Sequence, residues 1–227
     1  MTALAKYLAR DLEVLRENKV VSIKEDDEAW TLKTEAGKTF SGDTVVLTMP
    51  VPQSLQLLKT CNRSLPESDL NALSRIEYDP AIAVLALMTQ SSNVPEPGGV
   101  RFTEGPIAFV ADNHQKGISP DATAITIHID SQYSRDHWED SDDAIADFAL
   151  GQVREWVDPG HVKTVQVKRW KYSVPIVLYP HSCMEAFSDP KLVLAGDGFG
   201  GPRIEGAVVS GIAAAERILG KPVRIEG

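Results

Sequence analysis

The sequence has few cysteines and no long apolar run. Its two cysteines, Cys61 and Cys183, form no CxxC motif and are too few for a disulfide-rich secreted scaffold, so we expect reduced thiols and a cytoplasmic protein. No apolar stretch approaches the roughly 20 residues of a membrane-spanning helix. The polar opening Met1–Lys6 does not fit a signal peptide. We therefore expect no membrane partner.

Positive charge is also scarce. The 227 residues contain 23 Lys and Arg against 32 Asp and Glu, which gives a net charge of -9. An acidic chain that has no cluster of basic residues is repelled by the phosphate backbone of nucleic acids. We therefore expect no nucleic-acid partner. Tyr179, His181 and Cys183 alternate along the chain. This spacing does not define a metal geometry, and we predict no metal site.

The most informative stretch is Lys191–Ala207. An apolar run predicts a buried strand, a glycine-rich turn with one carboxylate follows, and residues Ile204–Leu219 predict a helix. Glycines let the backbone approach a ligand closely, and a helix N-terminus presents free N–H groups. This stretch is therefore predicted to contact an electron-rich group. The alternative is a tight turn between strand and helix whose glycines only serve the backbone.

Three of these glycines match a dinucleotide-binding fingerprint. Gly196, Gly198 and Gly201 have the spacing G-x-G-x-x-G. That fingerprint opens a βαβ unit whose second strand carries an acidic residue about 20 residues later. Here Gly220 ends the predicted helix and only a few residues follow. We therefore do not interpret the turn as the first turn of a Rossmann unit.

The rest of the chain alternates predicted strands and helices. It opens with a helix at Thr2–Asp11, a β-meander from Val20 to Lys38, and a strand at Thr44–Met49 that is expected to be buried on both faces. Further predicted elements are strands at 81–89, 107–111, 122–130 and 162–170, an extended segment at 172–179, a loop at 90–99, and helices at 54–58, 66–75 and 141–157. The pattern is typical of an α+β fold.

Three motifs resemble those of renalases. They are Val45–Pro52, Lys168–Tyr172, and Ala195–Phe199 with Ile204–Gly206, in this order. Renalases are FAD-dependent oxidoreductases related in fold to the flavin-containing amine oxidases. The resemblance extends over nearly the whole chain, but the N-terminal strand, G-x-G-x-x-G turn and helix of renalases have no counterpart here. The chain therefore looks like the C-terminal two thirds of a renalase.

The resemblance implies a division into domains. Residues 1–50 correspond to elements of an FAD-binding domain, residues 51–180 to an antiparallel-sheet substrate-binding domain with helices, and residues 181–227 to a C-terminal strand-loop-helix of the FAD-binding domain. That domain has the glutathione-reductase-like fold. The resemblance does not include the N-terminal strand, turn and helix of that FAD-binding domain. It therefore does not imply that this chain binds FAD alone.

The resemblance also implies which residues contact FAD. They are Gly196, Asp197, Gly198, Phe199, Arg203, Ile204, Glu205 and Gly206. Asp197 would accept a hydrogen bond from a ribityl hydroxyl, and the backbone of residues 203–206 would lie at the pyrimidine edge, where reduced flavin is negatively charged. Each of three residues has an alternative role. Asp197 would cap the turn between strand and helix, Arg203 would be solvated, and Glu205 would only interact with the helix dipole.

Four residues are candidates for substrate binding. His128 lies on an alternating strand on the face opposite Ile125, Ile127 and Ile129, where it either orients an amide or is partly exposed. Trp170 and Tyr172 alternate onto one face and form either a slot for a planar ring or a packing contact. Asn113 is either a ligand or a turn former.

The reaction that the resemblance implies is a hydride transfer. Renalases oxidise the 2- and 6-dihydro isomers of NAD(P) with FAD, and O2 then gives H2O2. The absence of a nucleophile motif agrees, because the flavin supplies this chemistry. One alternative is oxidation of an amine by the related oxidase fold. Another is a non-catalytic fragment that binds a ligand or a partner, with an exposed apolar seam that favours a homodimer.

Overall fold

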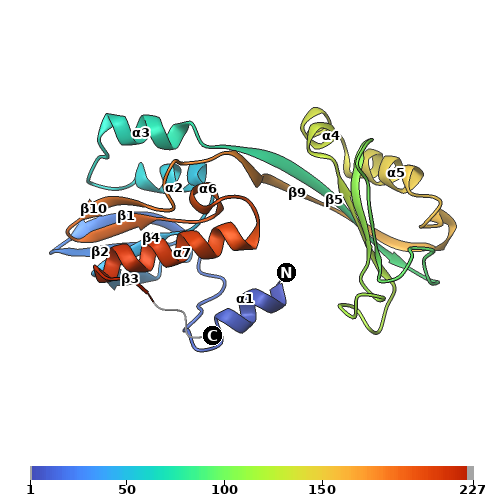
Figure 1. Cartoon of the computed structure of the whole chain (residues 1–227), viewed down its shortest axis with the longest axis horizontal. Helices are drawn as coiled ribbons and strands as arrows, with labels where there is room; N and C mark the ends of the chain where they lie inside the picture. The colour runs from blue at the N-terminus through green and yellow to red at the C-terminus, as the bar shows by residue number, and fades with distance from the viewer. Residues whose placement is uncertain (1, 224–227) are drawn as a thin grey trace. The chain divides into compact units, whose positions relative to one another are not determined.

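The computed structural model describes residues 2–223 and divides into two units (Figure 1). Unit 1 combines the chain up to Ile76 with the chain from Val177 onward, and unit 2 is the segment Glu77–Ile176. Each unit contains helices and strands, which confirms the predicted α+β class. Among the described residues, no helix is long and apolar enough to cross a membrane.

Unit 1 begins with helix α1 (Thr2–Leu8) and the predicted meander. The meander consists of β1 (Val20–Asp26), β2 (Ala29–Thr34) and β3 (Thr39–Gly42), paired in the order β1-β2-β3. Asp27 and Glu28 connect β1 and β2, and both have positive φ, at 46° and 65°. Two successive positive φ values are typical of a tight hairpin turn that follows the twist of its strands.

A second sheet in unit 1 carries the glycine-rich stretch. Its strands are β10 (Met184–Ser188), β11 (Lys191–Leu194) and β4 (Thr44–Leu47), and β11 pairs antiparallel with β10 and parallel with β4. The expectation that Thr44–Met49 is buried on both faces is wrong, because Val46 is 39% exposed. The central strand β11 is buried on both faces, whereas β4 ends this sheet within the described residues.

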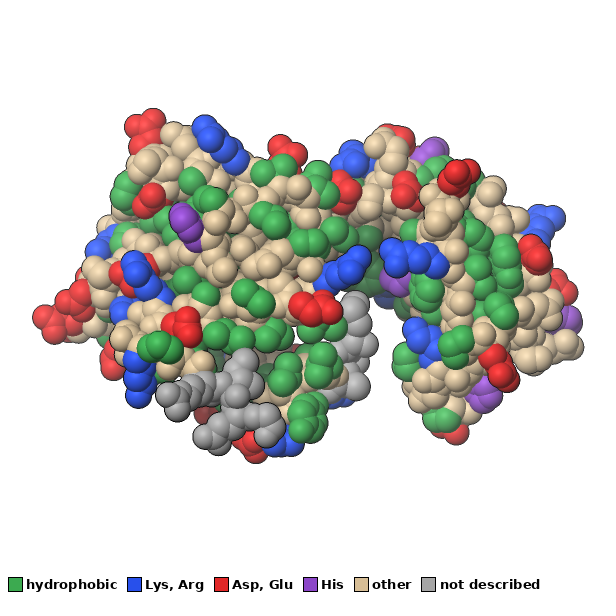
Figure 2. Space-filling view, viewed as in Figure 1, with side chains coloured by type: hydrophobic (Ala, Val, Ile, Leu, Met, Phe, Trp, Pro, Cys, Tyr) green, Lys and Arg blue, Asp and Glu red, His purple; other side chains and the backbone are tan. Residues whose placement is uncertain are grey.

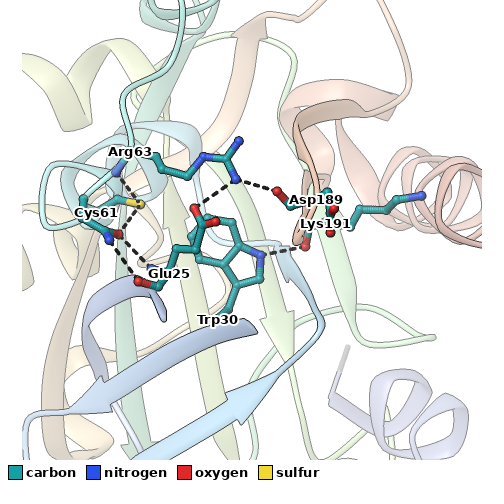
Figure 3. Close-up of polar contacts among 7 residues, drawn as sticks. Glu25, Trp30, Cys61, Arg63, Asp189 and Lys191 are labelled. Carbon is teal, nitrogen blue, oxygen red and sulfur yellow. Dashed lines mark hydrogen bonds and ion pairs between the residues drawn. The ribbon is translucent and has the colours of Figure 1, made fainter. Parts of the chain in front are cut away.

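A buried tryptophan ties the meander to β11. The indole N–H of Trp30 donates to the carbonyl oxygen of Lys191 over 3.0 Å (Figure 3). The ring of Trp30 lies 5.6 Å from that of Phe187. The guanidinium of Arg63 lies 4.3 Å from the centre of the Phe187 ring and forms a 3.0 Å ion pair with Glu25. These contacts fix the start of the strand that leads into the glycine-rich turn.

Four further helices belong to unit 1. They are α2 (Val51–Leu58), α3 (Glu67–Ser74), α6 (Asp197–Gly200) and α7 (Arg203–Leu219). Helix α2 begins three residues before its predicted start, because a proline is tolerated in the first turn of a helix. Hydrophobic side chains lie exposed along α7, where Figure 2 shows them between charged ones, and they include Ile204, Val208 and Val209.

Unit 2 is built on a five-stranded antiparallel sheet of order β6-β7-β8-β5-β9. Its strands are β5 (Glu77–Met88), β6 (Gly99–Arg101), β7 (Ile107–Asp112), β8 (Ala124–Ile129) and β9 (Val162–Val177). The two extended segments predicted on either side of residue 171 form the single strand β9.

Helices cover one face of this sheet. Unit 2 contains α4 (Ser131–Asp136), α5 (Asp142–Gln152) and the 3-10 turn η1 (Pro159–His161). Helix α5 starts where predicted, because Ser141 accepts a hydrogen bond from the N–H of Ala144, but it ends five residues early. Its apolar side packs on the buried isoleucines of β5 and β8.

Unit 2 lies within the segment 51–180 that the sequence assigns to a substrate-binding domain. Helices α2 and α3, which the sequence analysis grouped with residues 51–180, belong to unit 1. The chain passes between the units only around residues 76–77 and 176–177. Unit 2 is therefore one continuous segment that begins with the long strand β5.

Candidate functional site

The turn after β11 is anchored by backbone contacts. Gly196 has a φ of 128°, and its N–H donates to the hydroxyl of the buried Ser210 over 2.8 Å. A Cβ at Gly196 would lie 3.2 Å from the carbonyl oxygen of Thr48, at the end of the neighbouring strand. Glycine is therefore favoured both by the backbone angle and by the space available.

The next glycines allow α6 and α7 to touch through their backbones. A Cβ on Gly200 would collide with the carbonyl of Gly206, and a Cβ on Gly206 would collide with the carbonyl of Gly201. No side chain larger than hydrogen fits between these two backbone segments. The glycine-rich stretch is therefore a close backbone stack between a one-turn helix and the first turn of α7.

The N-terminus of α7 has no side-chain cap. Pro202 occupies the N-cap position and makes no side-chain hydrogen bond to the helix. The side chains of Arg203, Ile204 and Glu205 in the first turn are exposed, and Arg203 has a φ of 78°. The first N–H groups of a helix have no partner within the helix, so they are available to an electron-rich ligand.

Asp197 is the first residue of α6 and is partly buried. Burial raises the pKa of its carboxyl group, and hydrogen bonds from the backbone N–H groups of Gly198 and of Asp197 itself oppose this shift. Asp197 precedes α7 by several residues, and Pro202 occupies the N-cap position of that helix. The structure shows that Asp197 is the first residue of a short helix of its own, whose N-cap position is taken by Gly196.

Phe199 packs the turn against the chain entering unit 1. Its ring is buried and lies 5.2 Å from the ring of Tyr179. The N–H of Tyr179 donates to the carbonyl oxygen of Gly198 over 2.9 Å. The side chain of Phe199 therefore has a packing role in this turn.

Two of the substrate candidates come together on unit 2. Within β8, Ile125, Ile127 and Ile129 are buried, and His128 projects from the opposite face together with Thr126. The amide nitrogen of Asn113 donates to the hydroxyl of Thr126 over 3.0 Å. We call the sheet face that carries Phe109, Thr126 and His128 the open face.

The ionisation of His128 is shifted by its surroundings. Burial lowers its pKa, and the positive charge of Lys116 lowers it further. The pKa of the imidazole thus lies below its ordinary value of 6.5, so the ring is neutral at pH 7. A neutral imidazole offers one donor and one acceptor nitrogen.

The two aromatic candidates on β9 differ from each other. Trp170 is 47% exposed. Tyr172 lies edge to face with Tyr78 of β5, with ring centres 5.9 Å apart. The ring of Tyr172 therefore has an aromatic neighbour, while the ring of Trp170 is accessible.

Sequence reasoning did not single out Ser210, Phe109 or Lys116. The adjacent glycines Gly98 and Gly99 could have pointed to Phe109 and Lys116, because these two side chains lie against them. A separate cavity of about 790 Å³ lies in unit 1 beside α2, α3 and Phe187, and none of the candidate site residues lines it.

Comparison with known proteins reveals clear relatives. The model of the family described as flavin containing amine oxidoreductase matches residues 1–219. Renalase of Mus musculus is 25% identical over 210 residues, which cover 88% of this chain and 61% of the mouse protein.

Solved structures share the fold. Putrescine oxidase with bound putrescine superimposes with a TM-score of 0.65 at 12% identity, over 97% of this chain and 52% of that protein. Cyclohexylamine oxidase from Brevibacterium oxydans IH-35A gives a TM-score of 0.64 at 18% identity, over 96% of this chain and 52% of that protein. The chain thus spans about half of these structures and 61% of the curated relative.

Proposed function

Because the chain belongs to the flavin containing amine oxidoreductase family, we propose that it forms part of a renalase-like flavoprotein that oxidises 2- and 6-dihydro isomers of NAD(P). One dihydronicotinamide, one O2 and one proton would give NAD(P)⁺ and H2O2. Bound FAD would supply the hydride acceptor and pass the electrons to O2. The similarity to mouse renalase supports this choice of substrate.

The observation that carries the proposal is the glycine stack beside the uncapped start of α7. Gly200 and Gly206 let the backbones of α6 and α7 pack directly against each other, and no side chain caps the first turn of α7. We propose that the N–H groups of residues 203–206 donate to the pyrimidine edge of the flavin and stabilise its negative charge in the reduced state. The exposed side chains of Arg203, Ile204 and Glu205 are not needed for this role.

Asp197 has the second role in holding the cofactor. It is partly buried directly after Gly196, at the start of α6. We propose that its carboxylate accepts a hydrogen bond from a ribityl hydroxyl. Gly198 and Phe199 would shape the turn around it.

The open face of unit 2 would receive the substrate. His128 is neutral at pH 7 and can both donate to and accept from a carboxamide. Asn113 is held by Thr126 and would add a further polar contact. We propose that the accessible ring of Trp170 contributes a flat surface, with Tyr172 supporting the same strand.

Flavin retention tests the cofactor part of this proposal. We expect the purified chain, after incubation with excess FAD and desalting, to keep the visible absorbance of bound flavin. Asp197→Ala should lower the retained fraction, because a hydrogen bond to a charged group contributes about 1.5–3 kcal/mol. Asp147→Ala is the matched control, since Asp147 is an exposed carboxylate on α5.

Anaerobic mixing with candidate substrates tests the reaction. We expect 6-dihydro-NAD to bleach the flavin absorbance and O2 to restore it with release of H2O2. Bleaching by putrescine or cyclohexylamine, but not by dihydronicotinamides, would assign amine oxidation instead. A colourless chain would contradict catalysis by these residues alone and favour a fragment that binds a ligand or a partner. A homodimer and a cytoplasmic location stay predictions.

A further inference from the structure

We infer that Phe109, Lys116 and Arg101 form, next to His128, a binding surface on unit 2 for a nicotinamide nucleotide, with the aromatic ring for its nicotinamide and the two cations for its phosphate. This inference rests on the proposed oxidation of dihydronicotinamides and adds the residues that would select an anionic nucleotide over an amine.

Strand pairing brings an aromatic platform together. Phe109 of β7 pairs directly with His128 of β8 and with Arg101 of β6. Residues that pair directly in antiparallel strands project from the same face of the sheet. The ring centres of Phe109 and His128 are 6.4 Å apart, and the planes are inclined by 39°. Both side chains are partly exposed, so their ring surfaces can contact a flat ligand.

Two adjacent glycines make room for this platform. A Cβ at Gly99 would lie 2.8 Å from the tip of the Phe109 ring, so the ring lies on bare backbone. Gly98 has a φ of 94°, and a Cβ there would lie 3.0 Å from Cγ of Lys116. The stem of Lys116 therefore lies against Gly98, and its ammonium lies 5.6 Å from the centre of the Phe109 ring.

Within the described part of the chain, the cations at this platform have no acidic partners. Among residues 2–223, neither Lys116 nor Arg101 forms an ion pair with a carboxylate. The buried carboxylate of Asp112 instead accepts hydrogen bonds from Ser92 and from the backbone N–H of His114. Two exposed, unpaired cations thus flank one aromatic ring in a chain whose net charge is -9.

This combination matches one substrate class. A nicotinamide nucleotide has a flat ring with a carboxamide and an anionic phosphate. The rings of Phe109 and His128 fit the flat nicotinamide ring. The ammonium of Lys116 and the guanidinium of Arg101 fit the phosphate. A protonated amine would instead be repelled by Lys116 and Arg101. The surface therefore favours nucleotides over amines as ligands of the open face.

Binding to the whole chain without added FAD tests the inference. The probes are reduced nicotinamide mononucleotide and reduced nicotinamide riboside, which have the same ring and differ by the phosphate, and their fluorescence reports binding. We expect the mononucleotide to bind more tightly. Lys116→Gln and Arg101→Gln should each weaken mononucleotide binding about threefold, as for an exposed ion pair, and leave riboside binding unchanged.

Two variants complete the design. Phe109→Leu keeps an apolar side chain but removes the ring, and it should weaken the binding of both probes. Arg154→Gln removes an exposed positive charge near the end of α5 and should change neither affinity. Circular dichroism and thermal unfolding establish that each variant is folded.

The inference is overturned if Lys116→Gln and Arg101→Gln both keep the parental preference for the mononucleotide. It is also overturned if Phe109→Leu binds like the parent while inorganic phosphate displaces the probe, because the surface is then a simple anion site. Flavin reduction by 6-dihydro-NAD is measured separately. If 6-dihydro-NAD does not reduce the flavin but the chain still prefers the mononucleotide to the riboside, only the proposed function is contradicted. If the flavin is reduced but this preference is absent, only the present inference is contradicted.

Discussion

Asp197 and His128 are held toward their neutral forms by the same physical effect. Burial disfavours a charged group, so it raises the pKa of the carboxyl group and lowers the pKa of the imidazole. For Asp197 the backbone N–H groups at the start of α6 offset part of this cost. The two residues proposed to contact cofactor and substrate therefore each carry a desolvation cost in the folded protein, as is common at functional sites.

This cost predicts how stability depends on pH. The folded-state pKa of Asp197 lies above its ordinary value of 3.8, so the ionised carboxylate destabilises the fold at neutral pH, and this effect vanishes below pH 3.8. We expect Asp197→Asn to raise the thermal midpoint at pH 7 and the gain to shrink as the pH approaches 4. The gain in the free energy of unfolding should stay below about 1 kcal/mol, because the Asp197 side chain keeps contact with solvent.

Thermal unfolding followed by circular dichroism between pH 4 and pH 8 measures this difference. Asp147→Asn is the control and should leave the midpoint unchanged at each pH, since Asp147 is exposed. A lower midpoint for Asp197→Asn at pH 7 would mean that the backbone hydrogen bonds to the carboxylate outweigh its desolvation.

Among the secondary-structure elements, helix α7 contains two glycines that differ in the space available for a side chain. Gly206 faces the carbonyl of Gly201 in the stack with α6, so it has no room for a Cβ. Gly211 lies one and a half turns later on the exposed side of the same helix, and no atom lies within 4 Å of its Cβ position. The contact between α6 and α7, rather than helix propensity, therefore accounts for Gly206.

Two alanine substitutions test this difference. Gly206→Ala should destabilise the chain by about 3 kcal/mol or more, because backbone must move to relieve the overlap. Gly211→Ala should stabilise it by about 0.5–1 kcal/mol through helix propensity. Urea unfolding measures both, and flavin retention should fall only for Gly206→Ala. Equal stability of the two variants would contradict the close stack.

At the scale of the whole molecule, each unit has its own core. The main core of unit 2 gathers buried side chains of β5, β7, β8 and α5, and it includes Ile127. In unit 1, buried side chains of β11, such as Val193, pack with Ala214 of α7. Because the chain passes between the units only twice, we expect them to unfold as separate cooperative blocks.

Calorimetry of two core variants tests this expectation. Ile127→Ala and Leu192→Ala remove buried side chains from unit 2 and unit 1, and each should cost about 2–5 kcal/mol. We expect two thermal transitions, with Ile127→Ala lowering the midpoint of one and Leu192→Ala that of the other. A single transition that both variants shift equally would mean that the units unfold together.

Features that depend on neighbouring residues could be predicted from the amino-acid sequence. The strand, turn and helix from Lys191 to Leu219 followed from an apolar run, glycines and helical spacing, and the two faces of β8 followed from alternation around His128. These patterns are local, so each can be read from a few consecutive residues.

Features that depend on pairs of residues far apart in the chain became visible in the three-dimensional structure. It showed that Val46 is exposed, that Gly200 and Gly206 stack through their backbones, and that Phe109 meets Lys116 above two glycines. Strand order, backbone overlap and the grouping of charges arise when segments far apart in the chain pack together. No local periodicity encodes them, because register and burial are set by the partner segment as much as by the residue itself.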